Sequence, residues 1–490
     1  MHAACANGDD KPDLVGACPH SRLEGKEVGQ EGASPRRYLS VTVDNLISSK
    51  AQAQVNCYDP DRTMPAAATS GNRLAIHTSC GRRPEQSMSQ RDILVHDRTR
   101  LSAVLERSAA SGAMPPVPAI SFPPISLAPV PGPAAPPSAT IPDRPDLETV
   151  EFVVVVGFGT PAQPSTLMFD TGSDVSWTQC QPCTGHCYKQ EGPLFDPSKS
   201  STYGVVPCGA GACKFAGGRC NGTTCLYSVH YGDGSSTAGA LSEETLTFTS
   251  SRAFSSFVFG CGTTNLGDFG EVDGLLGLGR GMLSLPSQTT ESFGGSFSYC
   301  LPSFNSTPGY LSIGTTPVKG QVQYTAMIKK AMYPSFYFVE LTSINIGGYV
   351  LPVPSTVFTK TGTLLDSGTS LTYIPAKAYA LLRDRFKYTM QGNKPAPGFD
   401  ELDTCYDFSG QSAIVIPAVS LIFSDGAIFD LNFYGIMIFP DQTQPAVGCL
   451  AFVGSPAGMP FSVIGNTQQR STEVIYNVGG QRIGFVPNSC

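Results

Sequence analysis

The chain has 490 residues, of which 41% are hydrophobic and 14% charged, and its formal net charge is −7. This length favours two or three domains, and no apolar stretch approaches the ~18 residues of a membrane-spanning helix. The acidic balance argues against nucleic acid and acidic membrane surfaces as partners. With 52 glycines, 40 prolines and few charges, the composition favours turn-rich β structure over helices.

The first 145 residues differ from the rest in charge, since they hold 15 basic and 14 acidic residues against 17 and 25 in residues 146–490. Residues 1–80 show no clear periodicity, and we expect them to be largely disordered or to be a misassigned N-terminus. No signal peptide is recognisable, because Asp9, Asp10 and Lys11 stand where an apolar core should lie.

Residues 81–145 combine a helix with a proline-rich stretch. Leu94, Leu101 and Leu105 share one helical face, which predicts a basic helix over residues 89–107. Twelve prolines follow between Met114 and Pro145. Because proline breaks both helices and strand ladders, this stretch predicts an exposed and cleavable linker.

From about residue 146 the residue pattern is typical of a β protein. Short runs rich in Val, Ile, Phe, Tyr and Thr alternate with turn residues, which predicts strands over 151–158, 239–248, 255–261, 336–346 and 471–478. One helix is predicted over Pro375–Tyr388, which opens with proline and is rich in Ala, Leu and Arg.

An internal duplication is the most informative feature of this region. Phe169–Ser173 (FDTGS) matches Leu365–Thr369 (LDSGT) at an offset of 196 residues, as the two numberings show. Leu275–Gly277 and Val463–Gly465 then follow in the same order. One unit of domain size therefore occurs twice, which divides the region into residues 146–325 and 326–490.

The duplicated aspartates, Asp170 and Asp366, suggest acid–base chemistry. Each follows an apolar strand and precedes a glycine that permits a sharp turn. If the two loops meet at a pseudo-twofold axis, the carboxyls share one proton, because two like charges that close cannot both ionise. One carboxylate can then deprotonate a water while the other donates to an amide carbonyl. A single copy of the motif is weak support, whereas two copies in matching context are strong.

The two motifs resemble the active-site signatures of the pepsin-like aspartic proteases, over about residues 150–490. The resemblance implies an all-β dominated, bilobal fold with two pseudo-twofold-related lobes, a few short helices and a largely irregular N-terminal prosegment. It implies Asp170 and Asp366 as the catalytic pair. Six supporting positions follow from the family pattern: Thr171 and Ser367 clamp the loops, Ser173 and Thr369 bond the aspartates from outside, and Gly172 and Gly368 shape the turns.

A second family feature is the flap. Tyr231, Gly232 and Asp233, followed by Gly234 and Ser235, resemble the tip of the β-hairpin that folds over the substrate. Trp177, the one tryptophan of the chain, stands where the family keeps an indole that bonds the flap tyrosine.

The sixteen cysteines indicate a disulfide framework and therefore an oxidising compartment, since four precede residue 145 and an even twelve follow it. The cysteine-rich insert after the first aspartate resembles that of the nepenthesin-type plant aspartic proteases. Spacing alone does not choose among pairings. The resemblance implies Cys180–Cys183, Cys187–Cys261, Cys208–Cys225, Cys213–Cys220, Cys300–Cys490 and Cys405–Cys449.

The resemblance implies a monomeric zymogen, active at acid pH on protein or peptide substrates, with no cofactor or metal. We expect it to be secreted or vacuolar, with sequons at Asn221 and Asn305 as candidate glycosylation sites. Without a recognisable signal peptide, a cytosolic protein with reduced cysteines is the alternative.

Two further alternatives stay open. Cys180 and Cys183 have half of a zinc-ligand spacing, although no second pair follows. Some plant relatives of the fold are non-catalytic inhibitors, typically with damaged active-site triplets, whereas both triplets are intact here. Gly277, Gly279 and Gly281 suggest a nucleotide loop only superficially, because the spacing to a third glycine is wrong.

Overall fold

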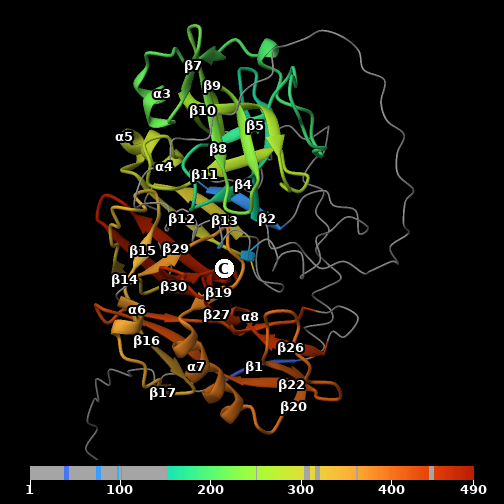
Figure 1. Cartoon of the computed structure of the whole chain (residues 1–490), viewed down its shortest axis with the longest axis vertical. Coiled ribbons are helices and arrows are strands. Elements are labelled where there is room, and N and C mark those ends of the chain that lie inside the picture. The colour runs from blue at the N-terminus through green and yellow to red at the C-terminus, as the bar shows by residue number, and fades with distance from the viewer. Residues whose placement is uncertain are drawn as a thin grey trace, which may run out of the picture. The chain divides into compact units, whose positions relative to one another are not determined.

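The computed structural model describes residues 38–42, 73–78, 97–98, 101, 152–249, 251–302, 309–314, 320–359, 362–440 and 446–489 (Figure 1). It has the bilobal, all-β dominated pepsin-like fold that the sequence predicts. The strands up to residue 326 are β1 (Tyr38–Thr42), β2 (Arg73–Thr78), β3 (Phe152–Phe158), β4 (Gln163–Asp170), β5 (Trp177–Gln179), β6 (Gly204–Val205), β7 (Arg219–Asn221), β8 (Thr224–His230), β9 (Ser236–Thr249), β10 (Arg252–Leu266), β11 (Gly274–Gly277), β12 (Ser296–Cys300), β13 (Gly309–Ile313) and β14 (Gln323–Ala326).

The strands of the second half are β15 (Phe338–Val339), β16 (Leu341–Ile346), β17 (Tyr349–Val350), β18 (Thr363–Leu365), β19 (Thr372–Ile374), β20 (Lys394–Ala396), β21 (Cys405–Asp407), β22 (Ala413–Pro417), β23 (Val419–Phe423), β24 (Ile428–Asp430), β25 (Met437–Ile438), β26 (Val447–Leu450), β27 (Phe452–Gly454), β28 (Ser462–Ile464), β29 (Thr472–Asn477) and β30 (Arg482–Pro487). The helices are η2 (Pro197–Lys199), α3 (Gly211–Phe215), α4 (Leu285–Gln288), α5 (Thr290–Phe293), α6 (Thr356–Thr359), α7 (Ala376–Thr389), α8 (Phe433–Ile436) and α9 (Asn466–Gln469). The five predicted strand regions and the predicted helix at Pro375–Tyr388 are confirmed.

The duplication in the sequence is a duplication in the sheet topology. In the first half β4 runs parallel to β11, and Asp170 lies opposite Gly277. In the second half β18 runs parallel to β28, and Leu365 lies opposite Ile464. The next strands match as well, because β5 and β19 each pair antiparallel with that same partner strand and parallel with β10 and β27 respectively. The two aspartate loops therefore leave equivalent points of two equivalent sheets.

A central sheet joins the two halves of the chain. The last strands, β29 and β30, pair with β12 and β14 of the first half, so that the order there is β14-β30-β29-β12-β13 (Figure 1). The sheet continues through β2 and β3 into the first lobe. The aspartate loops thus rest on a shared frame.

Two described strands lie within residues 1–80, the part of the chain that we expect to be largely disordered. β1 pairs antiparallel with β22, and β2 lies between β13 and β3. Both are short, β-prone runs whose partners come from distant parts of the chain, so local patterning gives little sign of them. The rest of residues 1–80 lies outside the described residues.

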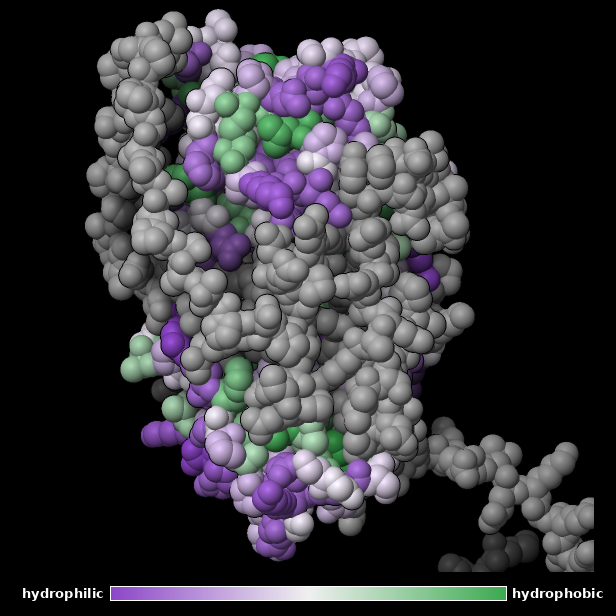
Figure 2. All heavy atoms as spheres, turned by 90° about the vertical axis from the view of Figure 1, so that its right-hand side faces the viewer, coloured by the Kyte–Doolittle hydropathy of each residue, from purple (hydrophilic) through white to green (hydrophobic). Residues whose placement is uncertain are grey.

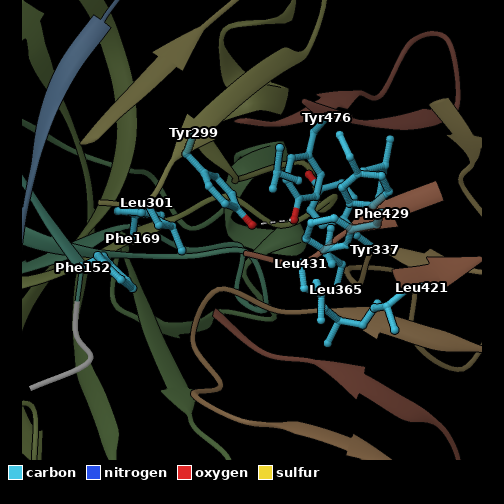
Figure 3. Close-up of a cluster of buried hydrophobic side chains, with 14 of the residues drawn as sticks. Phe152, Phe169, Tyr299, Leu301, Tyr337, Leu365, Leu421, Phe429, Leu431 and Tyr476 are labelled. Carbon is cyan, nitrogen blue, oxygen red and sulfur yellow. Dashed lines mark hydrogen bonds between the residues drawn. The ribbon is translucent and has the colours of Figure 1, made fainter. Parts of the chain in front are cut away.

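The core is aromatic and continuous beneath the aspartate loops. Phe169 and Leu365, which directly precede the two aspartates, belong to one buried cluster (Figure 3). In the same cluster the Tyr299 and Tyr476 hydroxyls lie 2.9 Å apart, within hydrogen-bond distance, joining β12 to β29. Packing of this density leaves the strand ends little freedom, so the loops that follow them are held in place.

Polar residues dominate the coloured surface of the face drawn in Figure 2, with smaller apolar patches among them. Large exposed apolar side chains such as Phe215, Met282 and Tyr388 are distributed over different elements. Among the described helices, not one is both long and apolar enough to cross a membrane.

The disulfides differ from the implied pairing in four cases. Among the described residues the bonds are Cys180–Cys261, Cys183–Cys187, Cys208–Cys220, Cys213–Cys225 and Cys405–Cys449. The last is the predicted one, because β21 and β26 place Cys405 directly opposite Cys449. The predicted pairs Cys180–Cys183, Cys187–Cys261, Cys208–Cys225 and Cys213–Cys220 are wrong. The predicted partner of Cys300, Cys490, lies outside the described residues.

Strand geometry explains the Cys180–Cys261 pair. Cys180 follows β5, and its N–H donates to the Gly262 carbonyl of the parallel strand β10, which brings it beside Cys261. In the hairpin of β7 and β8, Cys220 lies directly opposite Cys225, yet the two do not bond each other. Cys225 is buried and bonds the buried Cys213, whereas Cys220 is exposed and bonds the half-buried Cys208.

Candidate active site

The two predicted catalytic aspartates have matching local geometry. Asp170 ends β4 and Asp366 follows β18, and both side chains are buried. The Oδ1 of Asp170 accepts from the Gly172 N–H at 2.9 Å, and that of Asp366 accepts from the Gly368 N–H at 3.0 Å. Each carboxyl is thereby fixed by its own turn.

The two loops contact each other through the residues that follow the aspartates. The Ser367 N–H donates to Thr171 Oγ1 at 3.0 Å, and the Thr171 N–H donates to Ser367 Oγ at 3.1 Å. This reciprocal pair is the clamp expected from the family resemblance. It holds the two loops together at the positions adjacent to the carboxyls.

The outer hydroxyls behave differently in the two halves. Thr369 Oγ1 donates to Asp366 Oδ2 at 2.6 Å, as expected. The equivalent Ser173 hydroxyl is buried and has no hydrogen-bond partner among the described residues. The expected bond from Ser173 to Asp170 is therefore absent here.

The flap tyrosine lies where the sequence places it, at the tip of the β8–β9 hairpin. The turn closes through the Tyr231 N–H, which donates to the Ser235 carbonyl at 2.8 Å, and Asp233 accepts from the Ser235 N–H at 2.9 Å. The Trp177 indole N–H donates to the Tyr231 hydroxyl at 2.7 Å. Gly234 has φ +87°, a conformation that glycine adopts readily. The hairpin tip is thus bonded to the strand that follows the first aspartate loop.

The environment of the Tyr231 side chain keeps its hydroxyl protonated. Burial raises the pKa of Tyr231 well above its usual value, and the negative charge of Asp170 raises it further. The ring also packs edge-on against Phe269, with centroids 5.7 Å apart, and Phe269 in turn packs against Trp177 at 4.9 Å. Sequence reasoning missed Phe269. The tyrosine stays a neutral hydrogen-bonding group across the usual pH range.

A third acid, Asp174, supports the first loop and was not predicted. Its Oδ1 accepts from the Gly281 N–H at 2.7 Å, and its Oδ2 accepts from the Ser335 hydroxyl of the second half at 2.5 Å. Burial raises the pKa of this carboxyl. The sequence feature that could have indicated this contact is the run Gly277, Gly279, Gly281. A Cβ at Gly279 or Gly281 would collide with the Asp174 carboxyl.

The second loop is supported from the C-terminal side by α9. The Gln469 side-chain amide donates to the Asp366 carbonyl at 3.2 Å, and that of Asn466 donates to the Ser367 carbonyl at 3.0 Å. Neither residue was predicted, although both follow the duplicated Val463–Gly465 strand directly.

Two family models match the chain: Xylanase inhibitor N-terminal over residues 152–315 and Xylanase inhibitor C-terminal over residues 336–487. An aspartyl protease family protein of Arabidopsis thaliana is 43% identical over 354 residues, which cover 71% of this chain and 74% of the relative. The chain belongs to the pepsin-like aspartic protease family. The aspartic proteinase nepenthesin-2 of Nepenthes gracilis is 38% identical over 356 residues, covering 69% and 78%. This places the protease in the nepenthesin-type plant subgroup, as an aspartic-type endopeptidase.

Solved structures carry the same fold. The crystal structure of edgp has a TM-score of 0.59 at 20% identity and covers 70% of this protease and 93% of the other chain. The soybean basic 7S globulin has a TM-score of 0.56 at 20% identity, with coverage of 69% and 93%. At these identities the likeness concerns the fold.

The zinc alternative finds no support in the cysteines of the protease. Cys180 and Cys183 are both in disulfides and so cannot serve as thiolate ligands. In the part of the chain that the structure describes, no group of three or more His, Cys, Asp and Glu side chains is arranged to hold a metal ion.

Proposed function

We propose that the protease hydrolyses peptide bonds of protein substrates at acid pH by activating a water between Asp170 and Asp366. The observation that carries the proposal is the reciprocal clamp between Thr171 and Ser367, which joins the two aspartate loops beside their carboxyls. In this proposal the clamped loops bring the two carboxyls together, and the carboxyls share one proton because the second ionisation is opposed by the first.

In the reaction, one carboxylate deprotonates the water and the other carboxyl donates to the carbonyl oxygen of the scissile amide. The tetrahedral intermediate then collapses as a proton passes to the leaving nitrogen, and no covalent enzyme intermediate forms. The glycine N–H groups that donate to Oδ1 of each aspartate orient the two carboxyls for this chemistry, and Thr369 Oγ1 also donates to Oδ2 of Asp366.

The flap closes the site over the substrate. Tyr231 is held by Trp177 and lies near Asp170, so the hairpin tip covers the first aspartate. A closed flap excludes water and strengthens the polar interactions beneath it. The aromatic residues beside it, with Phe269 among them, favour substrates with apolar or aromatic side chains near the scissile bond.

The protease is made as a zymogen, secreted or vacuolar, and acts as a monomer. Residues 81–145 form its prosegment, which is cut between about Ser108 and Val150, in the proline-rich stretch. The contact of Arg98 with Asp400 and Glu401 supports this role, since it joins the segment to acidic residues of the second half. The exposed Asn221 is a glycosylation site, as is Asn305, which lies outside the described residues.

The test is hydrolysis of an acid-denatured protein by the oxidatively folded chain after removal of the segment. We expect cleavage on the acid side that is blocked by pepstatin and lost toward neutral pH, and a matched Asp170→Asn chain should be inactive. A chain that folds, binds pepstatin and cleaves nothing would instead be a non-catalytic binding protein of the same fold.

A further inference from the structure

A residue of the N-terminal segment is buried against the second aspartate loop. Asp97 is 1% exposed, although it belongs to a stretch that precedes the two lobes in sequence. Its carboxylate accepts from the Ser370 N–H at 2.9 and 3.0 Å and from the Leu371 N–H at 3.0 Å. These two N–H groups directly follow Asp366–Thr369, so the contact lies on the active-site loop itself.

The next residue anchors the segment with the opposite charge. Arg98 Nε contacts Glu401 at 2.6 Å, and its Nη2 contacts Asp400 at 3.2 Å. The hydroxyl of Tyr373, two residues beyond the loop amides, donates to Glu401 at 3.1 Å. Asp97, Arg98, Glu401 and Tyr373 thus form one network of charged and polar groups beside the loop.

An apolar contact completes the docking. Leu101 is buried in a cluster that includes Leu371, Phe338, Leu364 and Phe461. Asp97, Arg98 and Leu101 are all helical, and a spacing of four places Asp97 and Leu101 on one helical face. The described residues of the predicted 89–107 helix therefore touch the loop with one polar and one apolar side chain.

We propose that Asp97 is a latch, a residue of the prosegment that holds the Asp366 loop through the Ser370 and Leu371 N–H groups and keeps the zymogen inactive. This proposal deepens the proposed function and rests on it only for its effect on activity. A carboxylate that accepts several N–H bonds binds strongly because its charge assists each bond. Protonation of Asp97, or of the partners of Arg98, removes that charge and weakens the latch, so it opens in acid.

The test measures hydrogen exchange at neutral pH in the full-length chain carrying Asp170→Asn, which prevents self-cleavage. Adding Asp97→Asn should raise the exchange rates of the Ser370 and Leu371 amides by about 10- to 100-fold, because a hydrogen bond to a charged group is lost. Asp92→Asn makes the same charge change five residues earlier and should leave both amides protected. Asp97→Glu keeps the carboxylate and should retain much of the protection even if the Asn variant folds poorly.

A second measurement uses the chain with Asp170 intact. Before any cleavage of the segment, Asp97→Asn should hydrolyse an added substrate at a higher pH than the parent chain. Unchanged exchange of the two amides in both Asp97 variants would overturn the latch, whatever the activity. If exchange rises but no form of the chain cleaves substrate, even after removal of the segment, then the latch stands and the proposed function fails.

Discussion

The two aspartate loops have nearly the same sequence motif and different supports. At the offset of 196 residues, Asp174 of the first half corresponds to Ser370 of the second. Asp174 brings its own carboxylate to Gly281 and Ser335. Ser370 has no acid of its own, and its N–H is bonded by the carboxylate of Asp97 from the N-terminal segment. At this position the first loop is supported from within the two lobes, whereas the second is bonded by the N-terminal segment.

The difference between the two loops shows which features the duplicated halves have in common. The motif preserves the turn, the clamp and the parallel strand pair, which the chemistry needs in both halves. The surroundings diverge, because each half meets different neighbours: a flap near Asp170, and α9 and the segment near Asp366. The proposed latch would therefore act on only one of the two loops.

The largest expected effect, the loss of activity on replacing a catalytic aspartate, should be the same for both loops. Asp170→Asn and Asp366→Asn should each leave less than about a few per cent of the activity, because neither carboxyl can perform both proton transfers. Circular dichroism and thermal unfolding should show that both variants remain folded. Residual activity well above that level in either variant would break the assumed equivalence of the loops.

A smaller effect should be specific to the first half. Tyr231→Ala should lower kcat/KM by roughly 10- to 100-fold, because the flap loses its bond to Trp177 while the acid–base pair remains. Tyr231→Phe should cost less, since the ring is kept against Phe269. Tyr373, which corresponds to Trp177 at the offset of 196 residues, offers a control. It donates to Glu401 instead of to a flap tyrosine, so Tyr373→Phe should change kcat/KM less than Tyr231→Ala.

A third contrast concerns stability against pH. Asp273, just before β11, is buried, and the Phe461 that precedes β28 is its counterpart at the offset of 188 residues. Burial raises the pKa of Asp273 to about 7, and the negative charge of Glu191 contributes. A raised pKa means that the folded state binds this proton more tightly than the unfolded state. The contribution of protonated Asp273 to the free energy of unfolding is therefore fully present below the ordinary carboxyl pKa of 3.8, and it is lost as pH rises through about 7.

Asp273→Asn should remove this component, on the order of a few kcal/mol, because the amide resembles the protonated acid. Denaturant unfolding of parent and variant at pH 4 and pH 7.5 would measure it, and the variant should lose less stability between the two. Some dependence will remain, since burial also raises the pKa of Glu191 and of Asp174. An equal loss in both proteins would contradict the assignment.

The smallest expected effect is a difference in kcat between variants that lack the Thr369 hydroxyl and variants that lack the Ser173 hydroxyl. Thr369→Ala should lower kcat several-fold, because Asp366 loses a hydrogen bond of 2.6 Å, and Thr369→Ser should restore it. Ser173→Ala should leave kcat within about two-fold, since that hydroxyl makes no bond among the described residues. Comparable losses in the two alanine variants would show that Ser173 bonds Asp170 during the reaction.

Much of the site could be predicted from the sequence, because a duplicated motif specifies local geometry. The turns at Asp170 and Asp366 lie where the motif puts them, and the Thr171–Ser367 clamp and the Trp177–Tyr231 bond lie where the family resemblance implies them. Contacts between distant segments could not be predicted. Asp97 reaches amides 273 residues away, and nothing in its local sequence specifies this partner.

The sequence also could not predict which of several neighbouring cysteines form disulfides with each other. The hairpin of β7 and β8 sets Cys220 directly opposite Cys225, yet each bonds a cysteine from outside the hairpin instead. One of these partners, Cys213, is the buried residue of α3, so the pairing depends on how that helix packs. The spacing of cysteines along the chain does not predict that packing.

The position of β2 has a consequence for what processing can achieve. This strand pairs with β13 through Arg73–Ile76 and with β3 through His77 and Thr78, so it has hydrogen-bonded neighbours on both sides. A cut after residue 108 severs one peptide bond and none of these. If the proposed cut is made, the two pieces therefore stay paired, and the smaller one leaves only when β2 separates from β13 and β3. Cleavage and dissociation are separate events with separate rates, and a gel under denaturing conditions would count two polypeptides where a sizing column finds one.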